Sequence, residues 1–467
     1  MADDAKTKSE KSEGQKLWER VSRSPDWIVV ERMRVNGFWP AGEKLPEDPP
    51  DEVKERTALE ADRAKLLKTA LAVKDPERAL KEENERRILE SRKKKAERKV
   101  LRDKARRERR EAWVKKKQAA LVHLGLGVSA GLEHVESDVA RLQALGLPVL
   151  NDGTHLAASM GIALAELRWL TYHRRGAPLV HYHRYDIPKK TGGARHISAP
   201  KARLARAQQW VLANILDKLP VSEHAHGFVR DHSVVTNARP HVKRACVVNL
   251  DLKDFFPTIS FRRCKGLFGK MGYSEHVATV LALLCTEPPR VLVELDDKRT
   301  HVALGERVLP QGACTSPALT NLLCRRLDER MAGLARRHGL AYTRYADDLT
   351  FSGDSLDESA LLGSVRRVVE AEGFRVHPDK TRVMRKGRRQ EVTGVVVNTR
   401  PSIAREDWRQ LRAILHNAAK QGLQSQNRDQ RPEFAAHLAG RVAWVRMVDP
   451  RRGAQLGLLL QRALARG

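Results

Sequence analysis

Two adjacent acidic residues, Asp347 and Asp348, have the type and spacing best suited to chemistry in this chain. They follow Tyr345 and Ala346, and apolar and polar residues alternate on both sides over residues 340–353. This alternation predicts two short strands with the aspartates at the turn between them. Neighbouring carboxylates at the tip of a hairpin repel each other, so the arrangement is costly unless a cation neutralises it. A divalent metal ion, which prefers oxygen ligands, is the natural candidate.

A second acidic strand is expected far upstream of this hairpin. Residues 247–256 form an apolar run that ends at Asp251 and continues into an aromatic pair, Phe255 and Phe256. If a buried strand brings Asp251 beside the hairpin, three carboxylates form a cluster for two metal ions. One ion would lower the pKa of an attacking hydroxyl, and the other would hold a triphosphate and stabilise the leaving pyrophosphate. This is the chemistry of a nucleic-acid polymerase.

Three further sequence segments lie before, between and after these acids. Residues 187–197 form a hairpin that turns on glycine and carries three cations. Residues 309–317 contain a Gln-Gly pair before an expected helix, and residues 373–381 resemble a helix end followed by a turn. With these blocks in this order, the chain resembles a reverse transcriptase over roughly residues 140 to 467.

The resemblance implies roles for named residues. Asp251, Asp347 and Asp348 would be the catalytic metal ligands, joined by the carbonyl of Leu252, and would hold two Mg²⁺ ions that Mn²⁺ could replace. Cations on a rigid hairpin suit a triphosphate, and a guanidinium can clamp it in bidentate fashion. Phe256 would be a steric gate that excludes a 2′-hydroxyl, so that dNTPs are selected. The expected nucleotide-binding residues are Lys189, Lys190, Arg195, Phe255, Phe256, Gln311 and Gly312.

Two short segments narrow the resemblance to one branch of the family. Residues 237–241 fit the Asn-Ala-x-x-His signature of bacterial retron reverse transcriptases, and residues 392–394 fit their Val-Thr-Gly signature. The signature residues in this chain are Asn237, Ala238, His241, Val392, Thr393 and Gly394. The residues alone leave open whether Asn237 and His241 contact RNA or brace the palm.

The retron resemblance also implies a reaction and partners. Such enzymes copy part of a structured non-coding RNA into single-stranded DNA, starting from a 2′-hydroxyl of a guanosine in that RNA. The product is a branched multicopy RNA–DNA molecule. The resemblance further implies antiviral defence against phage, with a separate effector protein as a possible partner.

Composition agrees with a nucleic-acid partner. The chain has 467 residues, and 87 Lys plus Arg against 58 Asp plus Glu give a net charge of +29. A chain this basic needs a polyanionic partner or a high-salt environment, and nucleic acid is the default partner. It has no apolar run of about eighteen residues and no signal peptide in its first residues, so no membrane partner and a cytoplasmic location are expected. The five cysteines form no C-x-x-C pair, which favours free thiols over structural zinc.

The predicted fold class is α+β. We expect a right-hand polymerase of fingers, palm and thumb with an antiparallel palm sheet, preceded by a charged, mostly helical extension. Glycines near residues 122–136 suggest a linker. The basic helix before it is interpreted as an arm along RNA phosphates, with a solvated helix or weak coiled coil as alternatives. The expected divisions are a partly ordered polar segment at 1–50, the basic helical extension and linker at 51–136, fingers and palm at 137–400, and a helical thumb at 401–467.

Two rival functions remain from the sequence. A group II intron reverse transcriptase shares the Tyr-Ala-Asp-Asp stretch, but it normally continues past the thumb into a maturase region, and the retron signatures argue against it. A non-catalytic RNA-binding scaffold that regulates an effector needs only the basic surfaces, but all three acids are present. No set of RNase H acids is recognised, so removal of the template RNA is expected to need another protein.

Overall fold

The computed structural model describes residues 12, 25–44, 50–72, 76–189 and 192–465, which belong to two compact units, 1–109 and 110–467. The first unit contains the helices α2 (Pro25–Val35) and α3 (Pro50–Ala72) and most of α4 (Pro76–Ala119). One long helix is predicted over residues 51–118, whereas the structure has two. The second begins at Pro76, as expected for a residue that suits the first helical turn.

Helix α4 is polar around its whole circumference, and most of its side chains are exposed. Residues 92–119 contain fifteen Lys and Arg against four acidic residues. The first half carries ion pairs one helical turn apart, such as Arg78 with Glu82 and Arg87 with Glu83. Such pairs support a solvated helix that has no apolar face to bury.

The segment after α4, predicted to be a linker, packs into the larger unit. Leu121, Leu124 and Leu132 are buried in its main hydrophobic cluster. Two of the neighbouring glycines allow close packing, because a Cβ on Gly125 would collide with His173 and a Cβ on Gly131 would collide with the carboxylate of Glu275. Burial of the leucines therefore decides the structure here.

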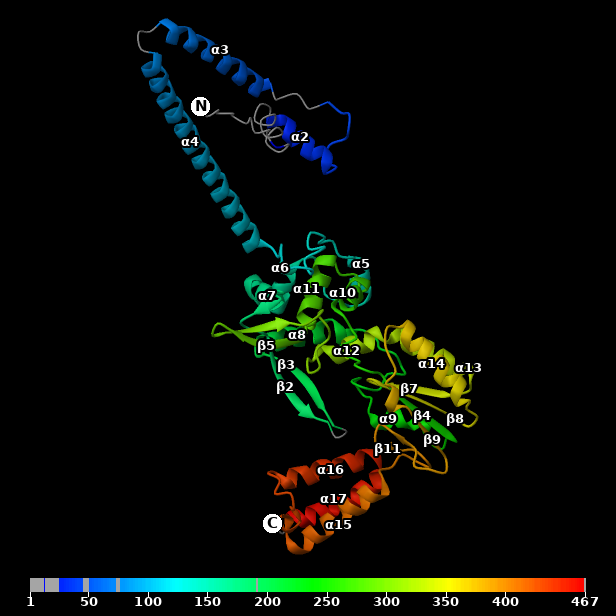
Figure 1. The fold of residues 1–467 in the computed structure, drawn as a ribbon. Helices are drawn as coiled ribbons and strands as arrows, with labels where there is room; N and C mark the ends of the chain where they lie inside the picture. Colours follow the sequence, from blue (N-terminus) through cyan, green and yellow to red (C-terminus); the bar gives the residue numbers. More distant parts are fainter. Residues whose placement is uncertain (1–11, 13–24, 45–49, 73–75, 190–191, 466–467) are drawn as a thin grey trace, which may run out of the picture. The chain divides into compact units, whose positions relative to one another are not determined.

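The fingers region combines helices with two small antiparallel sheets (Figure 1). Helix α11 is buried along almost its entire length and forms the centre of the core. Strands β2 and β3 form a separate long hairpin. The helices are α5 (Val139–Ala144), α6 (Gly153–Met160), α7 (Leu164–Thr171), α8 (Ala202–Asn214), α10 (Phe261–Lys270) and α11 (Glu275–Cys285), with the short η1 (Leu216–Lys218); the strands are β1 (Gly176–Ala177), β2 (Tyr182–Pro188), β3 (Ala194–Pro200), β5 (Arg290–Leu295) and β6 (Lys298–Ala303).

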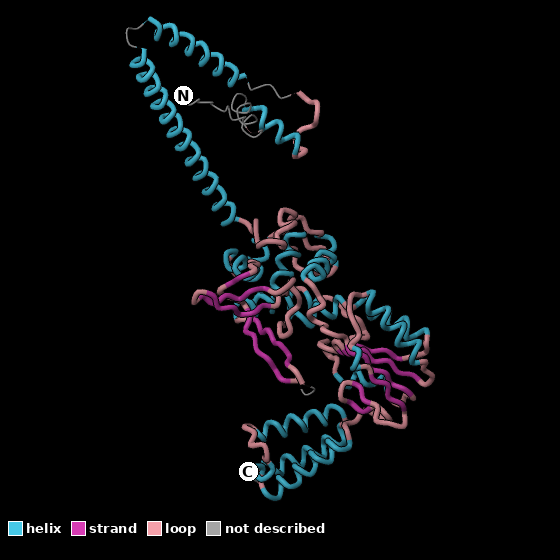
Figure 2. The backbone as a smooth tube through the Cα atoms, in the orientation of Figure 1, coloured by secondary structure: helices cyan, strands magenta, loops and turns pink. Residues whose placement is uncertain are grey.

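The palm is an antiparallel sheet, seen among the magenta strands in Figure 2. Its four strands follow the order β7-β8-β4-β9. Its central strand is the predicted apolar run, in which Val247, Val248 and Leu250 are fully buried. The antiparallel palm and the α+β class are confirmed. The strands are β4 (Cys246–Asp251), β7 (Ala341–Tyr345), β8 (Asp348–Gly353) and β9 (Arg382–Arg385); the palm helices are α9 (Val234–Ala238), η2 (Arg239–His241), α12 (Thr315–Leu323), α13 (Arg325–Arg337), α14 (Glu358–Ala371) and η3 (Pro378–Lys380).

A second hydrophobic cluster joins the C-terminal helices to the palm. It contains leucines of the helices, such as Leu411 and Leu438, together with Ala238 of α9 and Val392. Across the described residues, no helix is both long and apolar enough to span a membrane. The elements of this region are β10 (Glu391–Val392), β11 (Val395–Val396), α15 (Arg405–Gln421), η4 (Leu423–Gln426), α16 (Phe434–Val448) and α17 (Pro450–Leu464).

Candidate active site

Asp347 lies in a tight turn between β7 and β8. Tyr345 and Asp348 pair across the hairpin, so the turn consists of Ala346 and Asp347 alone. Ala346 adopts φ 57°, a left-handed conformation that is strained for alanine. The backbone N–H of Leu252 donates to the carbonyl of Asp347 at 3.0 Å, which ties the turn to the end of β4.

The register of the palm sheet brings the three predicted acids together. Asp251 at the end of β4 is the direct partner of Asp348 at the start of β8. Partial burial, followed by the charges of Asp347 and Asp251, raises the pKa of Asp348 to about 7. Burial and Asp251 also raise the pKa of Asp347, against the opposing effect of Lys380 and Arg195. The cluster therefore carries more negative charge than its surroundings compensate.

Lys380 of η3 is a member of this site that the sequence analysis did not identify. Its Nζ lies 2.9 Å and 3.0 Å from the two carboxylate oxygens of Asp251. With Asp251 facing this ammonium, no group of three or more Asp, Glu, His or Cys side chains in the described part of the chain is arranged to hold a metal ion as it stands. The donor set and its uncompensated charge nevertheless fit a hard divalent ion such as Mg²⁺ or Mn²⁺, which would compete with Lys380 for Asp251.

The catalytic hairpin is braced from behind by a buried ion pair. The guanidinium of Arg344 on β7 contacts both carboxylate oxygens of Asp328 at 2.7 Å, and both side chains are completely buried. Arg344 also donates to Asn321 Oδ1 at 3.0 Å and to the carbonyl of Ala346 at 3.1 Å. Sequence reasoning missed this pair, although a charged residue within a buried strand is a signal that a partner must exist.

The segment before α9 supports the same turn from another side. Backbone hydrogen bonds join Arg344 to His224 and His226, at 2.7 Å and 2.8 Å. Gly227 comes so close that a Cβ there would lie 2.6 Å from the backbone N of Ala346. The side chain of Asn321 donates to the Gly227 carbonyl at 2.9 Å. The position of the aspartates thus depends on groups that the motif itself does not include.

The fingers hairpin presents the predicted cations to solvent. Lys189 and Arg195 are exposed, and Arg195 pairs with Ile187 across the hairpin. The turn closes through a hydrogen bond from the Lys189 N–H to the Gly193 carbonyl at 3.0 Å. The charge of Arg195 acts on the pKa of Asp347, which places its guanidinium within electrostatic reach of the acids. Lys190 lies outside the described residues.

The predicted Gln-Gly pair packs against this hairpin. The N–H of Ser198 on β3 donates to the Gln311 carbonyl at 2.8 Å. Gly312 has φ 120°, and a Cβ there would lie 2.9 Å from the Ser198 carbonyl oxygen. Glycine is therefore required both by the backbone conformation and by the close approach.

The two phenylalanines after β4 have different environments. Phe255 is buried and packs against Phe374, with ring centroids 5.5 Å apart. It was predicted among the nucleotide-binding residues, but the structure places it in the core. Phe256 is half-buried, and its role as a steric gate stays a prediction.

The two retron signatures meet in space. Asn237 donates through Nδ2 to Thr393 Oγ1 at 3.3 Å, across 156 residues of sequence, and its Oδ1 is buried without a partner among the described residues. His241 is fully buried; its Nδ1 lies 2.7 Å from Ser352 Oγ and its Nε2 lies 2.8 Å from Thr343 Oγ1. Burial lowers the pKa of His241 to about 3. These contacts favour bracing of the palm strands over direct contact of His241 with RNA.

The remaining signature residues lie at the junction of the palm with the C-terminal helices. Thr393 and Gly394 form the turn between β10 and β11, and both have positive φ, 47° and 82°. Ala238 and Val392 are buried in the cluster shared with the helices. A Cβ on Gly394 would touch Trp444 of α16 at 3.7 Å. The Val-Thr-Gly hairpin is therefore a packing element between the two regions.

Comparisons with known proteins agree with this geometry. The family model described as reverse transcriptase (RNA-dependent DNA polymerase) matches residues 187–432. The retron Mx162 reverse transcriptase of Myxococcus xanthus is 42% identical over 417 residues, which are 84% of this chain and 83% of that protein. The retron Mx65 reverse transcriptase of the same organism is 46% identical over 68% of this chain and 73% of its own length. The retron Ec86 reverse transcriptase of Escherichia coli is 34% identical over 59% of this chain and 81% of that protein. The chain therefore belongs to the reverse transcriptases, and within them to those of bacterial retrons, which makes it an RNA-directed DNA polymerase.

Proposed function

We propose that this polymerase copies a structured non-coding RNA into single-stranded DNA from a 2′-hydroxyl of that RNA, and that Asp251, Asp347 and Asp348 hold two Mg²⁺ ions during synthesis. The observation that carries the assignment of the site is the pairing of Asp251 with Asp348 beside the Asp347 turn. The raised pKa values of Asp347 and Asp348 support it, because they mark partly buried carboxylates that repel one another and that a bound cation would stabilise.

The groups around the acids bind different parts of the incoming nucleotide. Divalent ions, when bound, supply Lewis-acid activation of the attacking hydroxyl and stabilise the departing pyrophosphate. The carbonyl of Leu252 adds an oxygen ligand beside the carboxylates. Lys189 and Arg195 bind the triphosphate from the fingers hairpin. Phe256 packs against the sugar and excludes a 2′-hydroxyl.

The template and its product occupy the surfaces on either side of these residues. Gln311 and Gly312 lie against the fingers hairpin and support the templating base. The helices α15 to α17 grip the template–primer duplex, and the basic half of α4 binds RNA phosphates. The net charge of +29 supports a polyanionic partner such as a template–primer duplex. The names of the relatives support a retron RNA as that partner.

The test of catalysis is primer extension with purified protein, an RNA template, a DNA primer, Mg²⁺ and dNTPs. We expect the wild type to extend the primer and the double variant Asp347→Ala/Asp348→Ala to be inactive. The matched control is Asp296→Asn/Asp297→Asn, which alters another Asp-Asp pair at the tip of a hairpin and should retain activity. Equal activity of wild type and Asp347→Ala/Asp348→Ala would refute the assignment of the site.

The branched product needs its own test. The chain is expressed with the non-coding RNA encoded beside it, and the nucleic acid is extracted and treated with a 2′,5′-debranching enzyme. We expect debranching to change the mobility of the DNA on a denaturing gel. DNA that is unaffected by debranching would contradict priming from a 2′-hydroxyl.

We further propose that the branched RNA–DNA serves anti-phage defence together with a separate effector protein. This proposal rests on the retron relationship. Cells carrying the intact locus should survive a phage challenge better than cells carrying Asp347→Ala/Asp348→Ala in the same locus. Equal plaque formation across a panel of phages would refute the defensive role against that panel.

A further inference from the structure

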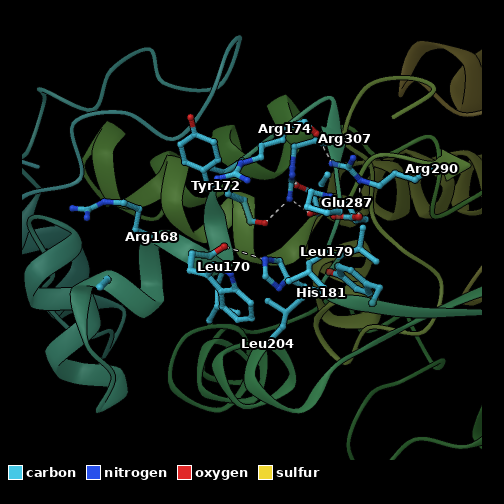
Figure 3. Close-up of a pocket in the computed structure, with 18 of the residues that line it drawn as sticks. Arg168, Leu170, Tyr172, Arg174, Leu179, His181, Leu204, Glu287, Arg290 and Arg307 are labelled. Carbon is cyan, nitrogen blue, oxygen red and sulfur yellow. Dashed lines mark hydrogen bonds and ion pairs between the residues drawn. The ribbon is translucent and has the colours of Figure 1, made fainter. Parts of the chain in front are cut away.

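The fingers region contains a cavity of about 350 Å³ (Figure 3). None of its lining residues belongs to the proposed catalytic site. Its walls come from α7, from the segment 174–182 that leads into β2, from the end of α11 and from the start of β5. Arg307 also lines it. Four arginines and one lysine line the cavity, against a single carboxylate, that of Glu287.

The guanidinium of Arg307 is buried, with 8% of the residue exposed, and its bonds go to neutral groups. It donates to Thr286 Oγ1 at 3.2 Å, to the Leu283 carbonyl at 2.8 Å and to His173 Nδ1 at 3.4 Å. Burial and the charge of Arg307 lower the pKa of His173 to about 4, so the histidine is a neutral acceptor. No carboxylate in the described part of the chain forms an ion pair with Arg307.

The one carboxylate nearby is already shared. Arg184 Nη2 and Arg290 Nε approach the same oxygen of Glu287, at 2.7 Å and 3.2 Å. A single negative charge therefore serves two guanidinium groups, while the buried Arg307 and the exposed Arg174 add two more positive charges. Buried charge is costly unless it is paired. This excess of positive charge at one side of the cavity calls for an anion.

The opposite side of the cavity is apolar and aromatic. In Figure 3, Arg174, Arg290, Arg307 and Glu287 gather together, whereas Leu179, His181 and Leu204 lie on the other side. Trp169 is 44% exposed and Leu179 is 68% exposed, so both are accessible from solvent. On the side of the arginines, the guanidinium of Arg174 lies 5.0 Å from the ring centre of Tyr172.

We propose that this cavity binds one nucleotide unit, with its phosphate among Arg174, Arg290 and Arg307 and its base against Trp169 and Leu179. Phosphate is the anion that guanidinium groups bind best, and aromatic faces stack on any base. The volume lies at the lower end of the range for small-ligand pockets, which suits a single nucleotide. The nucleotide comes from an unpaired position in an RNA strand or from the free nucleotide pool.

The RNA source rests on the proposed function, but binding in the cavity requires none of the three acids. The test places a photoreactive benzoylphenylalanine at position 179, where Leu179 is exposed, in the full chain. The protein is irradiated with a radiolabelled single-stranded RNA of about ten nucleotides or with radiolabelled ATP, each with and without unlabelled competitor.

We expect a covalent adduct whose yield falls about fivefold with Arg174→Glu, as loss of one charged contact predicts. Trp169→Ala should lower the yield as well. The matched control is Arg366→Glu on the exposed surface of α14, which makes the same change of charge elsewhere. Arg307 itself is left unchanged because its burial makes any substitution a test of folding.

Labelling by RNA that ATP does not compete would assign the site to an RNA strand, and labelling that ATP competes would assign it to a free nucleotide. The inference is overturned if neither ligand is labelled, or if Arg174→Glu lowers the yield no more than Arg366→Glu. Primer extension is measured on the same preparations. Extension without labelling would remove the cavity site alone, whereas labelling without extension would leave the cavity site and count against the polymerase assignment.

Discussion

Among the described residues, two hairpins carry an Asp-Asp pair at the tip, and they differ in backbone conformation, burial and surroundings. Asp296 and Asp297 form the two-residue turn between β5 and β6, and both are exposed. Asp347 and Asp348 lie at the turn between β7 and β8, where both are half-buried. The first pair has positive φ at both residues, whereas in the second hairpin the positive φ is at Ala346. Water can solvate the first pair, but only in part the second.

The difference shows that an acidic dipeptide becomes a site only through its neighbours. At the second tip, a third acid arrives from β4 by direct pairing with Asp348. Behind the turn, Arg344 and Asp328 neutralise each other and leave no charge to spare for the aspartates. Compensated charge holds the hairpin in place, and uncompensated charge is what a bound cation would satisfy.

The largest effect is expected from Asp251→Asn, which removes the acid that does not belong to the hairpin. Polymerase activity should fall by about a thousandfold, because losing a metal ligand removes several kcal/mol of transition-state stabilisation. Primer extension under single-turnover conditions measures it. Asp297→Asn on the exposed tip should have no effect. Full activity of Asp251→Asn would mean that the Asp-Asp turn is sufficient by itself.

The next effect concerns the buried pair behind the turn. Arg344→Met should lower the free energy of unfolding by about 3–5 kcal/mol, because it leaves the Asp328 carboxylate buried and unpaired. Urea unfolding followed by circular dichroism measures it. The double variant Arg344→Met/Asp328→Leu should recover more than half of the loss. If the double variant is no more stable than the single one, the pair does not act as a compensated unit.

A smaller effect is expected from the titration of His241. Its pKa is lowered to about 3 in the folded protein, against about 6.5 for an unperturbed histidine, so the folded state excludes a proton that the unfolded chain binds. Exclusion of this proton costs nothing above pH 6.5, and it lowers the free energy of unfolding progressively as the pH falls from 6.5 toward 3. When the pH is lowered from 7.5 to 5, the free energy of unfolding of His241→Gln should fall by about 2 kcal/mol less than that of the wild type.

Chemical denaturation of both proteins at the two pH values measures this difference. His173, whose pKa burial also lowers, titrates equally in both proteins and cancels in the comparison. Identical pH dependence of the two proteins would show that His241 is not kept neutral by its buried position between Thr343 and Ser352.

The smallest effect compares the two acidic tips directly. In EDTA at pH 8, Asp348→Asn should raise the melting temperature by about 2–4 °C, since it removes a carboxylate that is unfavourable when ionised. The pKa of Asp348 is raised to about 7, so its ionisation costs stability fully above pH 7 and not at all below about pH 4. Asp297→Asn should leave the melting temperature unchanged. Equal shifts at the two tips would remove the distinction between them.

Local patterns predicted the parts of this protein that depend on neighbouring residues. Alternation around residues 340–353 gave the β7–β8 hairpin, and the apolar run before Asp251 gave β4. The glycines near residue 125 predicted a linker that the structure does not have there, because glycine marks a turn or a close contact as readily as a flexible linker. There the leucines that pack into the core, such as Leu124, were the stronger signal.

The amino-acid sequence by itself established the family and the order of its blocks and predicted the three acids, because each depends on short motifs and on their order along the chain. It did not establish the contact of Lys380 with Asp251, the Arg344–Asp328 pair or the meeting of Asn237 with Thr393. Each of these joins residues from separate elements. A periodic pattern indicates which face of a strand is buried, but it does not identify the segment that packs against that face. Those contacts therefore arise only when the sheet register and the packing of helices bring distant segments together.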